Sequence, residues 1–122
     1  MKKSVLKGMP KFIVENGFIK TKGYGKLATV VMEDENVSIN AKALYAYLIC
    51  RIGGGDRCYP SNNKIMKELG IKSKNSLRDY KDELIIKGLL KVELRKSKSG
   101  RNLSNDYFPT RLIFETLEEK GG

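Results

Sequence analysis

The stretch PSNNKIMKELGIKSKNSLRDYKDELIIKGLLKVELR (60–95) decides the fold of this chain. It contains two short amphipathic segments, each preceded by a residue that favours helix capping. Ser61 is the predicted N-cap of the first segment, and Gly70 stands where a left-handed C-cap belongs. Ser73 is the predicted N-cap of the second segment, with Asn75 as the alternative. The apolar positions of the two segments are Ile65, Met66 and Leu69, then Leu77, Tyr80, Leu84 and Ile85.

A tight connection joins these two segments. Leu-Gly-Ile (69–71) and a polar cap separate them, which is the sequence form of a helix-turn-helix. A plain helical hairpin in an all-α bundle is the alternative. It is disfavoured by LLKVELR (89–95), which alternates apolar and polar residues like a half-buried strand with Leu90, Val92 and Leu94 on its inner face. Residues 96–104, which are polar apart from Leu103, and a strand-like run at 106–108 complete a predicted β-hairpin with a basic tip.

The sequence upstream predicts a further helix and a small hairpin. Ser38 favours the start of a helix, and Gly53-Gly54-Gly55 ends it. The predicted apolar face of this helix comprises Ile39, Ala43, Leu44, Tyr47 and Leu48 with the stem of Arg51. In KFIVENGFIK (11–20) the pair Asn16-Gly17 tolerates the positive φ angles of a type I′ turn, which predicts two short strands. Residues 23–26 are expected to form a loop.

Basic residues gather in two blocks of the sequence. The formal net charge is +10, from 24 Lys and Arg against 14 Asp and Glu. Residues 1–26 hold seven Lys and one acid, and residues 72–101 hold ten basic residues and four acids. Such clusters favour a nucleic-acid partner, because cations that neutralise phosphates release condensed counterions. Charge alone does not distinguish a nucleic-acid partner from a merely solvated basic surface. A membrane surface is a weaker alternative, because the sequence shows no long amphipathic basic helix.

The residue types present disfavour a metal site and an enzyme. The chain has no His, and two cysteines, Cys50 and Cys58, cannot supply the four Cys or His ligands of a structural zinc site. We expect Cys50, at the end of an apolar run, to be a buried free thiol. The absence of His removes the commonest general base. A nuclease acting through carboxylates is a minor alternative, because no metal-site spacing relates Asp34, Asp79, Asp82 and Asp106. We expect no cofactor and no small-molecule substrate.

Length and hydropathy favour one domain in the cytoplasm. A chain of 122 residues suits a single hydrophobic core. Its longest apolar stretches, such as Ala43–Cys50, fall well short of the roughly 20 residues that span a bilayer. None of them begins the chain like a secretory signal. We therefore expect a cytoplasmic location and no membrane partner.

Together these features resemble the winged helix-turn-helix domains of phage and plasmid replication proteins and of small DNA-binding regulators. The resemblance covers about residues 18–109. It rests on GFIKTKGYGKLATVVMEDENVSINAKALYAYL (17–48), CYPSNNKIMKELGI (58–71), LRDYKDELIIKGLL (77–90) and SNDYF (104–108). It implies an α+β fold: a three-helix core with a C-terminal β-hairpin wing, preceded by the N-terminal β-hairpin. We expect a basic tail at 1–10, the DNA-binding domain at 11–109 and an extension at 110–122 that favours helix over strand.

The resemblance also implies which residues meet DNA. The helix that begins near Ser73 would enter a major groove with its first turn facing the bases. Asn75 suits adenine and Arg78 suits guanine, whereas lysines and the cations of the wing suit phosphates. Asp79 and Asp82 would repel the DNA backbone unless they pair with neighbouring cations or point away. The expected DNA-binding residues are Lys72, Lys74, Asn75, Ser76, Arg78, Lys81, Arg95, Lys96, Lys98 and Arg101.

These observations predict a non-enzymatic double-stranded DNA-binding protein of a plasmid, phage or other mobile element. It would act at an origin of replication or transfer, or at an operator in transcription regulation. Replication proteins of this kind usually continue into a further domain. The chain is therefore a fragment of one or a stand-alone binder, for which TcpK-like plasmid transfer accessory proteins are an analogy. A homodimer and the replication or conjugation machinery are further expected partners. The alternative is a winged-helix protein-protein interaction module of a replication or transfer complex.

Overall fold

The computed structural model describes residues 12–100 and 104–113. Its elements, in order, are β1 (Val14–Glu15), β2 (Phe18–Ile19), α1 (Thr29–Met32), α2 (Ile39–Ile52), α3 (Asn62–Leu69), α4 (Lys74–Ile86), β3 (Leu90–Glu93) and β4 (Asp106–Pro109). The described part is thus α+β, with four helices and two antiparallel two-stranded sheets. The short α1 precedes the three helices that the sequence predicted. The predicted basic tail, Arg101 and most of the C-terminal extension lie outside the described residues.

The three predicted serine caps are confirmed. The side-chain oxygens of Ser38, Ser61 and Ser73 each accept a hydrogen bond from a backbone N–H in the first turn of α2, α3 and α4, at 3.1 Å in every case. Each bond satisfies one of the N–H groups that a helix start leaves without a partner. At the other end of α3, Gly70 adopts the left-handed conformation with φ 73°. The boundaries of the two helices in the turn are therefore fixed by local chemistry.

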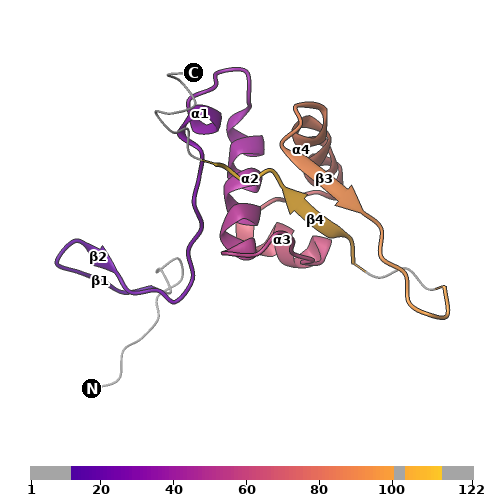
Figure 1. Cartoon of the computed structure of the whole chain (residues 1–122), viewed down its shortest axis with the longest axis horizontal. Coiled ribbons are helices and arrows are strands. Elements are labelled where there is room, and N and C mark those ends of the chain that lie inside the picture. Colours follow the sequence, from indigo (N-terminus) through magenta and orange to yellow (C-terminus); the bar gives the residue numbers. More distant parts are fainter. Residues whose placement is uncertain (1–11, 101–103, 114–122) are drawn as a thin grey trace, which may run out of the picture.

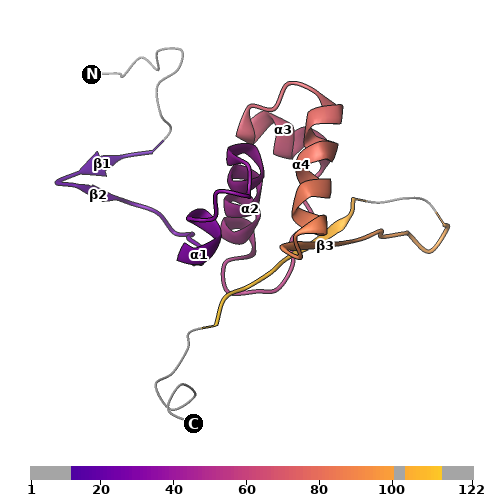
Figure 2. The ribbon, with the colours of Figure 1, turned by 90° about the horizontal axis from the view of Figure 1, so that it is seen from above.

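The core forms around α2. This helix buries Ala41, Leu44, Tyr45, Leu48, Ile49 and Ile52. Figure 2 shows α2 and α4 lying next to one another, with the connection through α3 above them. Ile65 of α3, Leu77 and Leu84 of α4, and Tyr107 of β4 complete the same buried cluster. Burial of each large aliphatic side chain contributes about 1.5–3 kcal/mol.

The buried face of α2 differs from the predicted one. Ile39 is 80% exposed and Ala43 is exposed, whereas Ala41 and Tyr45 are buried. The predicted buried face is rotated around the helix axis relative to the observed one, because α2 carries apolar residues on more than one side. Leu44 and Leu48, which lie where the two stripes overlap, are buried as predicted.

Two further burial predictions, for Cys50 and Leu94, were wrong. Cys50 is exposed and Cys58 is the buried free thiol, because Cys58 exchanges two backbone hydrogen bonds with Tyr107 within the core. Burial raises the pKa of the Cys58 thiol to about 11. Leu94 is 59% exposed because β3 ends at Glu93, one residue before it.

The two hairpins occupy opposite ends of the molecule (Figure 1). In the β1–β2 hairpin, Asn16 and Gly17 have φ angles of 53° and 82°, which confirms the predicted turn. In the β3–β4 hairpin, Leu90 pairs with Pro109 and Val92 with Tyr107 on the inner face. Lys91 pairs with Phe108 on the outer face. Residues 94–100, which follow β3, extend away from the helices (Figure 1). In the described part of the chain, no helix has the length and apolarity needed to cross a membrane.

Candidate nucleic-acid interface

The turn between α3 and α4 presents the start of α4 to solvent. The amide of Ile71 donates to the carbonyl of Met66 at 2.9 Å, and Gly70 reverses the chain between them. The cap of Ser73 then starts α4. Lys72, Lys74 and Asn75 are exposed at this point. A helix start also carries partial positive charge and unpaired N–H groups, both of which suit an anionic partner.

Arg78, one turn further along α4, is also exposed. Its Nε lies 3.8 Å from Oδ1 of Asp79, and the two side chains are 66% and 69% exposed. An exposed ion pair of this length contributes little, so the guanidinium can exchange this partner for a stronger one. The repulsion expected from Asp79 is therefore offset in part by its neighbour. Asp82 is exposed on the same helix.

Lys81 lies apart from the other cations of α4. Its Nζ donates to Oδ1 of Asn62 at 2.7 Å and to the hydroxyl of Tyr107 at 2.6 Å. It also lies 4.9 Å from the centre of the Tyr107 ring. These contacts join α3, α4 and β4 through a single ammonium group. Ser76 is likewise half-buried, and its hydroxyl bonds with that of Ser73 at 2.9 Å.

The cations of the β3–β4 hairpin divide into two groups. Arg95 lies where the strands end and the loop begins, and its guanidinium stacks 4.7 Å from the centre of the Tyr59 ring and lies 3.6 Å from Oδ1 of Asp106. Lys96 and Lys98 are exposed beyond it. Arg95 therefore ties the start of the loop to β4, whereas Lys96 and Lys98 leave their charge exposed to solvent.

The sequence did not single out a cationic stack on the outer face of this hairpin. The guanidinium of Arg57 lies 5.1 Å from the centre of the Phe108 ring, and Nζ of Lys91 lies 5.5 Å from it. Lys91 also pairs with Glu93 at 2.9 Å. The alternation of residues along the strands could have indicated that Lys91 and Phe108 point outward. Arg57 comes from the loop before α3, and its position beside them depends on the tertiary fold.

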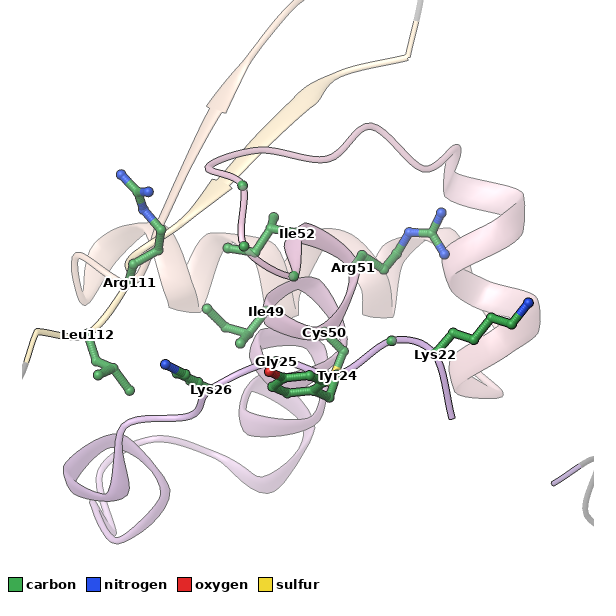
Figure 3. Close-up of a pocket in the computed structure, with 14 residues that line it drawn as sticks. Lys22, Tyr24, Gly25, Lys26, Ile49, Cys50, Arg51, Ile52, Arg111 and Leu112 are labelled. Atoms are coloured by element: carbon green, nitrogen blue, oxygen red, sulfur yellow. The ribbon is translucent and has the colours of Figure 1, made fainter. Parts of the chain in front are cut away.

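A second group of cations surrounds a cleft beside the C-terminal half of α2 (Figure 3). The cleft has a volume of about 710 Å³, and Lys22, Lys26, Arg51 and Arg111 are the basic residues that line it. Gly25 forms part of its wall, where the chain passes so close to α2 that an added Cβ would lie 2.6 Å from the carbonyl oxygen of Ile49. The segment before α1 is thereby seated against α2.

Arg51 is held at the edge of this cleft by α2 and α3. It lies 5.7 Å from the centre of the Tyr47 ring and 3.6 Å from Oε1 of Glu68. The Tyr47 hydroxyl donates to the same carboxylate at 2.6 Å. Burial and this hydrogen bond raise the pKa of Tyr47 to about 12, and the hydrogen bonds from Tyr47 and Lys64 lower the pKa of Glu68. At neutral pH Tyr47 is therefore protonated and Glu68 is ionised, and their hydrogen bond joins α2 to α3.

Residues 36–90 match the family model of a helix-turn-helix domain. The matched segment runs from the residues before α2 to the start of β3 and includes the turn and all of α4. No curated protein and no solved structure matched the chain. A helix-turn-helix domain indicates DNA binding, with the second helix of the motif reading the major groove. Within 12–100 and 104–113, no three His, Cys, Asp or Glu side chains gather where a metal ion could be held.

Proposed function

We propose that this chain is a non-enzymatic double-stranded DNA-binding protein with a winged helix-turn-helix arrangement. In this proposal α4 enters a major groove, and the β3–β4 hairpin is the wing that follows the neighbouring phosphates. The match to a helix-turn-helix domain at 36–90 carries the proposal, because the matched segment contains α3, the turn after it and α4. The exposed cations at the start of α4 and along the hairpin support it.

The expected DNA-binding residues take three roles in this proposal. Asn75 and Arg78 read base edges from the exposed first turns of α4. Phosphates are contacted by Lys72, Lys74, Lys96, Lys98 and Arg101. The remaining residues, Ser76, Lys81 and Arg95, hold the helix and the hairpin in position, since each has a partner within the fold. These three residues thus support DNA binding by positioning α4 and the hairpin, without contacting DNA themselves.

The biological setting proposed is a plasmid, phage or other mobile element. The resemblance of the sequence to replication proteins and small regulators of such elements supports an origin of replication or transfer, or an operator, as the target. Such a protein works in the cytoplasm beside the replication or conjugation machinery. In the alternative proposal, the same surfaces dock a protein of that machinery and the positive charge is incidental.

Titration of labelled duplex DNA at several salt concentrations tests this function. The logarithm of the association constant should fall linearly with the logarithm of the salt concentration, by roughly one unit of slope for each phosphate contact. Binding that is absent at low salt, or unaffected by salt, would exclude DNA as the partner and favour the protein-docking alternative. A random-pool selection then identifies the preferred sequence.

A further inference from the structure

The basic cleft of Figure 3 lies on other elements than the surfaces assigned to duplex DNA. It is formed by the segment before α1, the C-terminal half of α2 and the chain after β4. None of its described lining residues comes from α4 or from residues 94–100. Its volume of about 710 Å³ is of the size that ligand-binding clefts have. The residues that line it indicate which kind of ligand it fits.

The cleft carries an excess of positive charge. Lys22, Lys26, Arg51 and Arg111 line it, and none of its described lining residues is acidic. Among these four, within the described part of the chain, only Arg51 forms an ion pair, with Glu68 at 3.6 Å. Glu68 and the partial negative charge at the C-terminus of α2 still leave about +2.5. A cleft lined by one sign of charge concentrates counterions, so this one fits an anionic ligand.

The four cations lie on two sides of an exposed aromatic ring. Figure 3 shows Lys26 and Arg111 on one side of Tyr24. Lys22 and Arg51 lie on the other side. The residue between these two pairs, Tyr24, is 69% exposed. The cleft therefore offers a surface for stacking between two sites for negative charge.

This arrangement matches the chemistry of a nucleic-acid strand. A mononucleotide carries its phosphates at one end, so it can engage one pair of cations alone. A strand has a phosphate before and after each base, so it can engage both pairs while a base stacks on the ring between them. In a duplex the bases are stacked on one another and their faces are covered, whereas a single strand exposes them.

The backbone that carries the ring is fixed against α2. Gly25 passes so close to this helix that an added Cβ would lie 2.6 Å from the carbonyl oxygen of Ile49. Tyr24 and Lys26 are the neighbours of Gly25 in the sequence, so this contact sets where both side chains start. A ligand that stacks on the ring does not have to order this segment, which lowers the entropy cost of binding.

We propose that the cleft binds a single strand of nucleic acid, with one base stacked on Tyr24 and the two flanking phosphates held by the two pairs of cations. Every base has a face for stacking, so the site accepts strands of any sequence. Because the cleft and the start of α4 belong to different elements, the inference does not depend on duplex binding.

Two pairs of lysine substitutions separate the cleft from the duplex surface. Lys22→Ala with Lys26→Ala removes one cation from each side of the ring. Lys72→Ala with Lys74→Ala removes the same charge from the start of α4 and is the matched control. All four side chains are exposed, so the fold should remain, which circular dichroism checks. Fluorescence anisotropy of the full chain measures binding to a labelled oligothymidylate of about 10 nucleotides, and to labelled duplex, at several salt concentrations.

The cleft variant should bind the oligothymidylate more weakly and the duplex as the wild type does. Its salt slope for the strand should fall by about 1.4, since each phosphate of a single strand contributes about 0.7. The α4 variant should lose duplex affinity and keep strand affinity. Equal loss of strand affinity in the two variants would mean that net charge alone holds the strand, which overturns the proposal.

The two functions can fail separately in this experiment. A wild type that binds the strand through the cleft but binds no duplex contradicts the proposed duplex function and leaves the present inference standing. A wild type that does not bind the strand overturns the inference, whatever the duplex titration shows.

Tyr24→Leu tests stacking at constant charge. Its affinity for the oligothymidylate should fall about 5-fold or more, whereas Tyr24→Phe keeps the ring and should bind like the wild type. An abasic strand of the same length keeps the phosphates and lacks the bases, so it should bind the wild type and Tyr24→Leu equally. The proposal is wrong if Tyr24→Leu loses no affinity, or if thymidine monophosphate binds the cleft as tightly as the strand does.

Discussion

The ammonium group of Lys81 on α4 donates a hydrogen bond of 2.6 Å to the hydroxyl of Tyr107 on β4. It reaches Oδ1 of Asn62 on α3 at 2.7 Å at the same time. One side chain thus links both helices of the turn to the hairpin behind them. This half-buried joint helps to set the angle between α4 and the hairpin.

Replacing Lys81 with Met should lower stability without removing a DNA contact. Loss of hydrogen bonds from a charged donor costs about 1–2 kcal/mol, which lowers the thermal midpoint of a domain of this size by about 4 °C or more. Binding should weaken, but the slope of affinity against salt should stay unchanged. Thermal unfolding and duplex titration measure the two quantities.

Lys74→Met is the matched control, because Lys74 is exposed at the start of the same helix. Its thermal midpoint should stay near that of the wild type, and its salt slope should fall by about 1. If Lys81→Met also loses a unit of slope, Lys81 contacts a phosphate and the positioning role is wrong.

Local chemistry explains what the sequence predicted correctly. Ser38, Ser61 and Ser73 cap their helices through atoms three residues away, and Asn16-Gly17 forms its turn alone. The partners of Lys81 and Arg95 come from distant parts of the chain, so periodicity could not separate these cations from exposed ones such as Lys74. The same limit explains Cys50, whose exposure depends on which side of α2 the other elements cover.

Glu83→Gln should destabilise the fold in a pH-dependent way. The backbone and hydroxyl of Ser38 donate to this carboxylate, and these hydrogen bonds lower the pKa of Glu83 below its ordinary 4.5. A carboxylate with a lowered folded pKa contributes stability above its unfolded pKa and loses it as the pH falls through the folded value. Urea unfolding should separate the variant from the wild type at about pH 7, and the difference should shrink towards about pH 3.

The exposed Glu35 provides the control for this measurement. Glu35→Gln should unfold at the same urea concentration as the wild type at both pH values. A Glu83→Gln difference that persists unchanged in acid would mean that the carboxylate acts through its shape rather than its charge.

Gly25→Ala should detach the segment before α1. The added Cβ would lie 2.6 Å from the carbonyl oxygen of Ile49, a clash with helix backbone that cannot swing aside. Overpacking of this kind costs about 1–3 kcal/mol. Gly23→Ala is the control, since nothing lies within 4 Å of the Cβ it would gain. Equal thermal midpoints for the two variants would show that the segment is not seated on α2.

Arg78→Ala should relax sequence preference more than it weakens binding. The exposed guanidinium is suited to a guanine edge, and a good bidentate contact gives about 1–3 kcal/mol of discrimination against other bases. Competition between the selected site and single-base variants of it measures this discrimination. Arg78→Lys keeps the charge and loses the fork geometry, so it should restore affinity but not preference. A variant that keeps full preference would assign base reading to Asn75 or to other residues.

Removing the cations of the hairpin loop should weaken binding to all sequences alike. Lys96 and Lys98 are exposed beyond the anchored Arg95, and Arg101 follows them in the sequence. Replacing all three by Ala should reduce the salt slope by about 3 if each neutralises a phosphate, with no change in base preference. Exchanging them within the charge class, as Lys96→Arg, Lys98→Arg and Arg101→Lys, should preserve affinity because phosphates respond to charge. Equal affinity of the triple Ala variant and the wild type would remove this hairpin from the DNA contact and leave α4 to carry it alone.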